Sequence, residues 1–532
     1  MTAGELRAAA DQLVVLHGRF APLFGRKESR RHALAYLRGL LLAEGRKSVE
    51  PMALVFGEGL GAKSADDNAV IAMQRFLTAS PWEWGPVQRE IQQVFAEELV
   101  PSAASWPIGT VGIVDASGFA KKGTESVGVA RQHCGRLGKV DNCQVGVFLL
   151  GTTPAGSALL DQQLYLPKSW VNDHPRRRKT RVPKRLKFRT KPQIAAQLLG
   201  RTLQAGHVRF DWIIADEEYG NNGGFLDALE AMSQRYLVEV PVSTTVWSVD
   251  PAAAVPVSRG MGRPPSRPRR EAVRTVRQVA ESLPAEAWQT LALREGALGP
   301  LVFQFARLRV WAVRHRRPGP PVWLLVRRSL SAKPELKYYV SNAPEPEPLE
   351  TMALVTGCRW RVEEFFEEGK SYLGMAHYEA RSWTSWHHHM SLVGLAHLFV
   401  TLTRQRLKKN FRADLGHGDP PAQERSPAAS VDALRRPGDP KVPFAAKPHR
   451  PTLAPQHVAG SAQKRRIQNA AVELASGDHR AIERSGEAHR KSGSPFPLGS
   501  AENALALTFP SVVLHMRAFN DQAHLPRRLV RR

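Results

Sequence analysis

Apolar residues recur at intervals of three and four positions through roughly the first hundred residues of the chain. The stretches "ESRRHALAYLRGLLLAEG" and "PVQREIQQVFAEELV" show this spacing most clearly, with charged residues on the opposite side of each predicted helix. We therefore expect a helical region over residues 1–105. Its early basic residues form either a solvated face or a surface that contacts DNA.

The spacing changes near residue 107. The runs "PIGTVGIVDASG", "NCQVGVFLLGTTP" and "FDWIIADEEYGNN" are apolar and rich in β-branched residues, which is typical of buried strands. The helical stretch "PQIAAQLLGRTLQAG" lies between the second and the third run. Strands that alternate with helices predict an α/β sheet, here over residues 106–240.

Two further changes of pattern follow. Residues 241–345 hold strand-like pieces such as "VFQFARLRVWAVRH" and "PVWLLVRRSL" between Pro- and Arg-rich loops, which predicts a mostly β insertion. A helical pattern returns over residues 346–405, in "RWRVEEFFEEGK" and in the apolar stretch "SLVGLAHLFVTL".

Residues 406–532 differ from the rest of the chain in composition. The sequence has 12 Trp and 8 Tyr, and all of them lie before this segment, which is rich in Ala, Arg, Pro, Gly and Ser. This composition predicts a disordered basic tail. A shifted reading frame or a fused neighbouring segment would explain the same change.

Charge indicates the class of partner. Lys and Arg number 75 against 49 Asp and Glu, which gives a net charge of +26. Such an excess favours a polyanion, above all nucleic acid, because basic side chains neutralise phosphates. A solubility feature or an acidic membrane surface are the alternatives. At 532 residues, the chain is long enough for two or more domains.

Other features narrow the class of protein. The three cysteines, Cys134, Cys143 and Cys358, form no CxxC pair, so neither a zinc site nor a disulfide framework is expected. The N-terminus lacks the layout of a signal peptide, and the longest apolar stretch is too short for a membrane span. We therefore expect a cytoplasmic protein without a membrane partner. No P-loop pattern occurs, so ATP use is not indicated.

Two aspartates follow predicted strands. Asp115 comes after "VGIV" and Asp216 after "WIIA". In open α/β sheets, ligand sites form at the carboxyl ends of the strands. Carboxylates delivered there from two strands can share Mg²⁺, which prefers oxygen ligands. Each aspartate taken alone is also typical of a simple turn.

The stretch "RWRVEEFFEEGK" supplies a third acid. Because a helical residue advances by about 100°, Arg359, Glu363 and Lys370 share one face of this helix. A solvated salt-bridge ladder would produce the same spacing.

Together, "DASGFAKKGTESVGVARQHCGRLGKVDNCQ", "ADEEYG" and "RWRVEEFFEEGK" resemble the DDE transposases of bacterial insertion sequences, in the subgroup with an R-x3-E-x6-K motif. The resemblance covers about residues 15–405. It implies an α/β, RNase H-like catalytic core with a β insertion between the second and third acids. Thr356 stands where the subgroup usually has Tyr, so one phosphate contact of the subgroup is not expected here.

The resemblance also implies roles for individual residues. Asp115, Asp216 and Glu363 would be the catalytic triad that holds two Mg²⁺ ions, with Mn²⁺ as a substitute. Arg359 and Lys370 would grip DNA phosphates. Trp323 would stack on a flipped base, unless it is an ordinary core residue of a strand.

The activity implied is two-metal phosphoryl transfer on double-stranded DNA, at the element's terminal repeats and at target DNA. Cleavage through a hairpin or by another route stays open. A homodimer in the synaptic complex and a nucleoid-associated location in a bacterium are implied as well. The alternatives are a catalytically inactive DNA-binding relic and an unrelated basic RNA-binding or nucleoid protein.

Basic and histidine clusters complete the candidate residues. The run at residues 174–193 holds ten Lys or Arg, which suits a DNA backbone but also suits a solvated loop. The expected DNA contacts in this run and after Asp115 are Lys121, Lys122, Arg176, Arg177, Arg178 and Lys179. In "WHHHM", His387, His388 and His389 point in different directions on a helix, so we expect surface or DNA-proximal residues rather than a metal site.

Overall fold

The computed structural model describes residues 3–56, 67–252, 273–296 and 299–414. All of them belong to one compact unit, and the second unit, Asp432–Ala504, lies outside the described residues. Most of the predicted tail at 406–532 is likewise outside them. Within the described ranges, no helix is long and apolar enough to cross a membrane.

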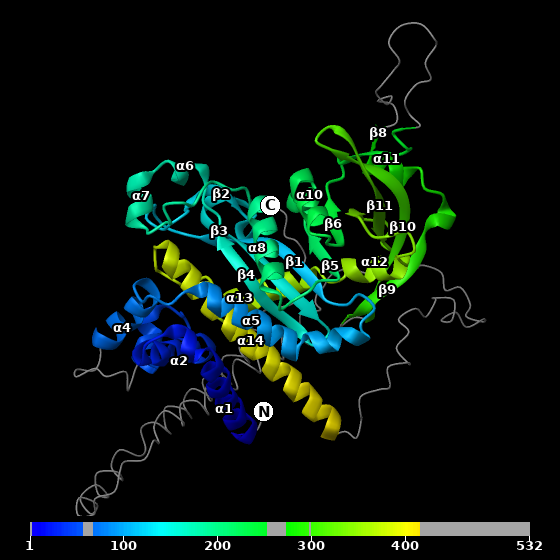
Figure 1. The fold of residues 1–532 in the computed structure, drawn as a ribbon. Helices are drawn as coiled ribbons and strands as arrows, with labels where there is room; N and C mark the ends of the chain where they lie inside the picture. The colour runs from blue at the N-terminus through cyan, green and yellow to red at the C-terminus, as the bar shows by residue number, and fades with distance from the viewer. Residues whose placement is uncertain (1–2, 57–66, 253–272, 297–298, 415–532) are drawn as a thin grey trace, which may run out of the picture. The chain divides into compact units, whose positions relative to one another are not determined.

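The N-terminal region is helical (Figure 1). Its elements are α1 (Ala3–Phe20), η1 (Ala21–Phe24), α2 (Lys27–Leu42), α3 (Val49–Phe56), α4 (Asp67–Thr78), α5 (Trp84–Glu98) and η2 (Val100–Ser105). In α5, the buried residues Val87, Ile91, Val94 and Phe95 follow the spacing seen in the sequence. Helical periodicity was therefore a sound guide to this helix.

A mixed sheet forms the centre of the chain (Figure 1). Its strands are β1 (Val111–Ala120), β2 (Ala130–Cys134), β3 (Lys139–Thr153), β4 (Gly156–Leu164), β5 (Trp212–Ala215) and β6 (Tyr236–Val240), with η3 (Gly135–Leu137) between β2 and β3. Strand β3 pairs antiparallel with β1, β2 and β4. Strand β5 pairs parallel with both β1 and β6. The predicted α/β class is confirmed.

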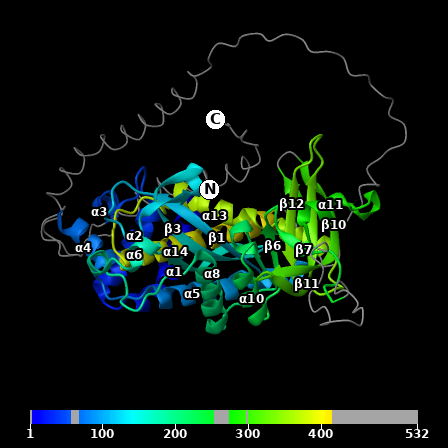
Figure 2. The ribbon, with the colours of Figure 1, turned by 90° about the horizontal axis from the view of Figure 1, so that it is seen from above.

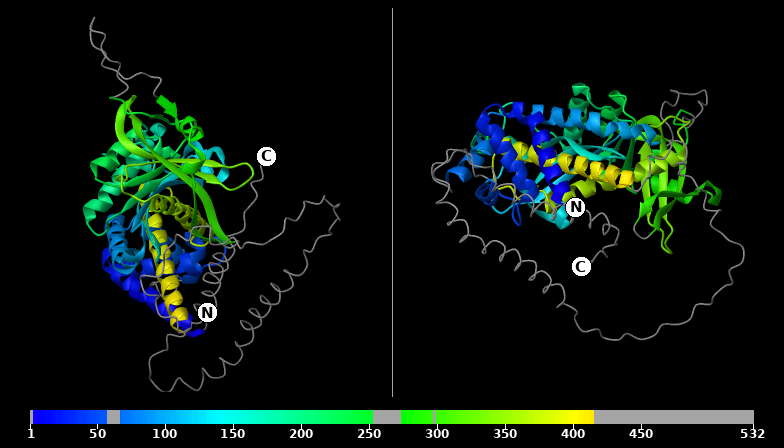
Figure 3. Two further views of the ribbon diagram at one scale, coloured as in Figure 1. Left: turned by 90° about the vertical axis from the view of Figure 1, so that its right-hand side faces the viewer. Right: turned by 90° about the horizontal axis from the view of Figure 1, so that it is seen from below.

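This part of the chain also forms the helices α6 (Lys168–Val171), α7 (His174–Lys179), α8 (Lys191–Ala205), α9 (Glu217–Gly220), α10 (Gly223–Ala231), α12 (Leu349–Thr356), α13 (Trp360–Ser371) and α14 (Trp383–Asp414). Of these, α8, α9, α12, α13 and α14 contact strands of the sheet. Thr190 starts α8 with a capping box, in which its side chain and that of Gln193 bond each other's backbone. The yellow helix α14 contacts β4, α2 and α5 (Figure 3). It extends to Asp414, past residue 406, where the predicted tail begins.

The strands after residue 241 continue the central sheet rather than forming a separate one (Figure 2). The elements are β7 (Thr245–Trp247), β8 (Val273–Thr275), α11 (Val276–Glu281), η5 (Ala285–Ala287), β9 (Gln289–Gly296), β10 (Gly299–Arg314), β11 (Arg317–Ser329) and β12 (Leu336–Ser341). Strand β12 pairs antiparallel with β6, with Tyr338 opposite Val240. The chain then returns to the core through α12.

The three histidines of "WHHHM" are buried, so the expectation of surface or DNA-proximal residues was wrong. His388 stacks on Trp82 with 3.6 Å between ring centroids, and His389 Nδ1 lies 2.8 Å from Tyr36 Oη. Burial lowers their pKa, to about 3 for His387, about 4 for His388 and about 3 for His389. The reason is that α14 packs against helices on one side and β4 on another, so side chains pointing in several directions are enclosed.

Candidate active site

The two aspartates are neighbours because their strands are parallel and adjacent. Val114 pairs with Ala215, so the next residue of each strand, Asp115 and Asp216, lies at the same level. Strand β1 continues to Ala120 along β3, so Asp115 lies within β1 and not at its end. It does lie where the pairing with β5 ends. Asp216 caps α9, and its Oδ1 accepts the Glu218 amide at 2.9 Å.

Helix α13 brings the third acid to this place. Glu363 lies in its first turn and Arg359 directly precedes the helix. The Arg359 guanidinium lies 3.5 Å from Asp115, 3.7 Å from Asp216 and 3.3 Å from Glu363. One arginine therefore joins three carboxylates that come from three separate elements.

Lys370 reaches the same site from the end of α13. Its Nζ donates to Ser117 Oγ at 2.6 Å. Ser117 was missed in the sequence, although the two-residue period of a strand places its side chain on the same face as that of Asp115. The fold thus brings together the two aspartates and the three named residues of the R-x3-E-x6-K motif, which are Arg359, Glu363 and Lys370.

Burial and charge act in opposite directions on the aspartates. The pKa of Asp115 is raised to about 7, because burial and the charges of Asp216 and Glu363 together outweigh the lowering by the Arg359 charge and the Ala116 amide. Asp115 is 9% exposed, and its Oδ1 accepts the Ala116 amide at 2.7 Å. Burial also raises the pKa of Asp216, again against the effect of Arg359. Both carboxyl groups would be more acidic with additional positive charge nearby.

Tyr219 is a second residue that sequence analysis missed. Its side chain is fully buried, and no partner for its hydroxyl occurs among the residues that the structure describes. Burial raises its pKa well above the ordinary value, and the charges of Asp115, Glu218 and Asp216 act in the same direction. The only signal in the sequence is its position three residues after Asp216.

The donor set suits a hard divalent cation, but the arrangement seen does not hold one. In the described part of the chain, no group of three His, Cys, Asp or Glu could hold a metal ion as placed. Asp115 Oδ2 and Asp216 Oδ2 nevertheless face the same guanidinium nitrogen of Arg359. Carboxylate oxygens are the ligands that Mg²⁺ prefers. The residues therefore fit such an ion at the place where the Arg359 charge now lies.

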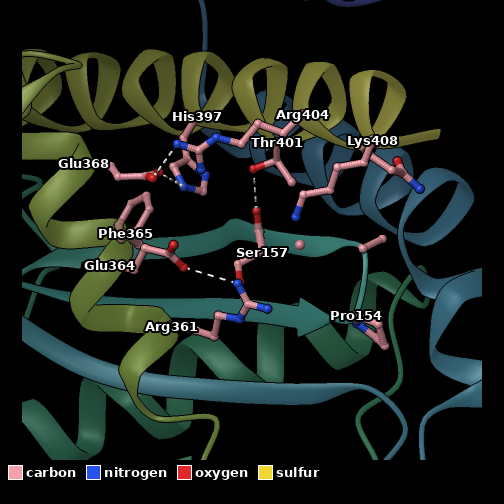
Figure 4. A pocket seen from close by; sticks show the side chains of 13 residues that line it. Pro154, Ser157, Arg361, Glu364, Phe365, Glu368, His397, Thr401, Arg404 and Lys408 are labelled. Carbon is pink, nitrogen blue, oxygen red and sulfur yellow. Dashed lines mark hydrogen bonds and ion pairs between the residues drawn. The ribbon is translucent and has the colours of Figure 1, made fainter. Parts of the chain in front are cut away.

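The other acids of "RWRVEEFFEEGK" have different partners (Figure 4). Glu368 binds Arg404 of α14 at 2.6 Å and lies 3.5 Å from His397, while Glu364 pairs with Arg361 at 3.3 Å. Burial raises the pKa of Glu368, but the hydrogen bond to His397 and the Arg404 charge outweigh it and leave the pKa at about 2. These residues line a cavity of about 60 Å³, and the contacts of Glu368 with Arg404 and His397 fasten α13 to α14.

The two lysines after Asp115, Lys121 and Lys122, differ in their exposure to solvent. Lys122 is exposed. Lys121 is half-buried, donates to the Tyr378 carbonyl at 2.9 Å and lies 3.5 Å from the centre of the Tyr378 ring. Burial lowers its pKa to about 8. Only Lys122 has the exposure expected of a phosphate contact.

The basic residues of the run after β4 also differ in their exposure to solvent. Arg177 is 8% exposed and donates to the carbonyls of Val171, Pro183 and Leu186, which gives it a structural role instead of the predicted DNA contact. Arg176 is half-buried, lies 3.8 Å from the Trp170 ring centre and donates to the Thr124 carbonyl. Arg178 and Lys179 are exposed, and Lys179 pairs with Glu125 at 2.5 Å.

Trp323 lies in β11, which holds none of the three acids Asp115, Asp216 and Glu363. It is half-buried, and its Nε1 donates to the Pro344 carbonyl at 3.3 Å. The guanidinium groups of Arg307 and Arg309 lie 4.3 and 5.0 Å from its ring centre. The ring is therefore neither an ordinary core residue nor fully exposed.

Comparison with known proteins agrees with this geometry. Residues 19–300 match the family described as DDE superfamily endonuclease, a range that includes Asp115 and Asp216 and ends before Glu363. The chain is also similar to a probable transposase for insertion sequence element IS701 from Microchaete diplosiphon, with 31% identity over 169 residues. That alignment covers 32% of this chain and 40% of the relative, so the chain matches well under two thirds of the relative's length.

Proposed function

This chain belongs to the DDE superfamily endonucleases, and from that membership we propose that it is an insertion-sequence transposase. It would bind the ends of its element as double-stranded DNA, cut them and transfer the strands to target DNA. One observation carries the proposal: Asp115, Asp216 and Glu363 converge from three elements on the guanidinium of Arg359.

We propose that the core is RNase H-like. The strand arrangement supports this, with β1 between the antiparallel β3 and the parallel β5, and with β6 parallel beyond β5. The domain limits predicted from the sequence are kept as part of the proposal, namely 1–105, 106–240, 241–345, 346–405 and 406–532. The strands of the insertion occur between Asp216 and Glu363 along the chain.

In the proposed mechanism, Asp115, Asp216 and Glu363 would hold Mg²⁺, with Mn²⁺ as a substitute. Two such ions, when bound, activate the attacking oxygen and stabilise the leaving oxygen of the phosphodiester. The chain's own contributions are positional. Asp115 releases its proton, which its pKa of about 7 allows at neutral pH and above. Lys370 and Arg359 orient the DNA phosphate beside the acids.

The DNA surface would extend from this site over the exposed basic side chains. We propose Lys122, Arg178 and Lys179 as phosphate contacts, with Arg176 and Lys121 as partly buried residues at the edge of that surface. Trp323, flanked by Arg307 and Arg309, would stack on a base. A homodimer that joins two DNA ends, in the bacterial cytoplasm at the nucleoid, completes the proposal.

Cleavage of a plasmid that carries the element's own ends tests this function. With Mg²⁺, the wild-type protein should cut at the ends and Glu363→Gln should not, while both bind the ends equally. Glu363→Gln should fold normally because its side chain is 69% exposed. Binding without cutting by the wild type would instead support the inactive relic. Failure to bind end DNA in preference to other DNA would refute both.

A further inference from the structure

Arg359 lies among the carboxylates of three acids. Its contacts with Asp115, Asp216 and Glu363 are 3.5, 3.7 and 3.3 Å long. Some arginines that link separate elements make shorter contacts, such as 2.6 Å between Arg404 and Glu368 and 2.7 Å between Arg235 and Glu347. Charge-assisted hydrogen bonds are strongest at about 2.7–2.9 Å. Arg359 therefore shares its charge among three acids and makes no optimal bond to any of them.

A divalent cation would compete with Arg359 for the same carboxylate oxygens. Asp115 Oδ2 and Asp216 Oδ2, the oxygens available for a cation, are those that face the Arg359 nitrogen. Their second oxygens accept backbone amides of Ala116 and Glu218. A cation on these oxygens would lie beside the guanidinium, and two like charges at such close range repel each other.

We propose that Arg359 closes the acidic cluster in the DNA-free chain, and that a DNA phosphate opens it to the divalent cation by drawing the guanidinium away. Phosphate is a suitable competitor because its oxygens accept two parallel hydrogen bonds from one guanidinium, which the dispersed carboxylates do not. The Arg359 side chain is 25% exposed, so an incoming phosphate can reach it. This inference rests on the proposed function.

The consequence is positive coupling between DNA and metal. Binding of the DNA end raises the affinity for the cation, and the cation raises the affinity for the DNA end by the same factor, because coupling between two binding sites is reciprocal. Couplings of this kind usually amount to roughly 5- to 150-fold. Metal-dependent cutting is thereby restricted to chains that already hold DNA.

The test measures Mn²⁺ binding and needs no catalytic turnover. Electron paramagnetic resonance of free Mn²⁺ gives the affinity with and without a saturating short duplex that already ends at the element's terminus. The pH is increased until the affinity no longer changes, which removes competition by the proton on Asp115. Wild type is compared with Arg359→Gln and with the matched control Arg361→Gln. Arg361 lies two residues away and pairs with Glu364 instead.

The wild type and Arg361→Gln should bind Mn²⁺ at least about fivefold more tightly when the duplex is present. Arg359→Gln should bind Mn²⁺ without DNA as tightly as the wild type does with DNA, and the duplex should add little. Two results would overturn the inference. One is a duplex effect that persists in Arg359→Gln. The other is loss of the duplex effect in Arg359→Gln without tighter Mn²⁺ binding in the absence of DNA, which would mean that Arg359 only binds DNA.

Failure of the proposed function itself gives a different result. If the three acids hold no metal, neither the wild type nor Arg359→Gln binds Mn²⁺ beyond what the duplex alone binds, and Asp115→Asn changes nothing. The coupling proposal then fails together with its premise. If Asp115→Asn abolishes Mn²⁺ binding while the duplex has no effect on the wild type, the triad stands and only the coupling is wrong.

Discussion

Replacement of Asp115 by Asn should stabilise the metal-free protein while abolishing cleavage. Asp115 is nearly buried, and burial raises its pKa from 3.8 to about 7. The unfolded chain therefore releases this proton more easily than the folded chain does, so ionisation of Asp115 favours unfolding. Asn has nearly the same shape, keeps an oxygen for the Ala116 amide and carries no charge to desolvate.

The magnitude follows from the two pKa values. They differ by about three pH units, and at about 1.4 kcal/mol per unit this corresponds to about 4 kcal/mol. Because the pKa is raised in the folded state, the contribution of Asp115 to stability falls as the pH increases from about 4 to about 7 and stays constant above that. We expect the Asp115→Asn substitution to add about 2–4 kcal/mol at about pH 8 and close to nothing below about pH 4.

Urea unfolding of both proteins between pH 2 and pH 8, in the presence of a chelator, measures this difference. Glu368→Gln provides a control of opposite sign, because the pKa of Glu368 is lowered to about 2. Its replacement should destabilise the protein above a pH of about 4.5, and the effect should fade as the pH falls toward 2. The reasoning is refuted if Asp115→Asn destabilises the protein at pH 8, or if its effect does not grow with pH.

Three more predictions test other parts of the structure. Arg177→Ala should lower the free energy of unfolding by about 2–4 kcal/mol, because three backbone carbonyls lose their donor. Arg178→Ala should leave stability unchanged and weaken DNA binding. Equal effects of the two substitutions in thermal denaturation would contradict this. His387, His388 and His389 are held neutral with lowered pKa values, so their contribution to stability should fall as the pH drops below 6.5. His388→Leu should therefore lose less stability than the wild type over that range, and an identical pH dependence in both proteins would count against this reasoning. Tyr219→Phe should change stability by less than about 1 kcal/mol, since no partner of the hydroxyl occurs in the described ranges, and a larger loss in urea unfolding would reveal a hidden hydrogen bond.

Periodicity and residue type were enough to predict some parts of this structure. The apolar spacing of α5 and the β-branched runs of β1 and β5 depend on local burial, so they are visible in the sequence. The shared face of Arg359, Glu363 and Lys370 follows from helix geometry alone. Their convergence with Asp115 and Asp216 agrees with the family resemblance, because the three motifs imply one site.

Contacts made between distant segments were not predictable in this way. Nothing in "WHHHM" shows that α14 is covered by α2, α5 and β4, so its histidines were placed at the surface. Arg177 and Arg178 are identical neighbours in sequence, and only the turn of α7 decides which one is buried. The position of Arg359 between the three acids also depends on tertiary structure. The spacing of charged residues along one helix is the same for a solvated salt-bridge ladder and for an arginine that also contacts acids of other elements.

The pairing of β12 with β6 joins the strands after residue 241 to the sheet that carries Asp115. After β12, the chain enters α12 and then α13, which holds Glu363. A chain without these strands would leave β6 with an open edge, which invites pairing with other chains. Such a chain would therefore need another element to cover that edge.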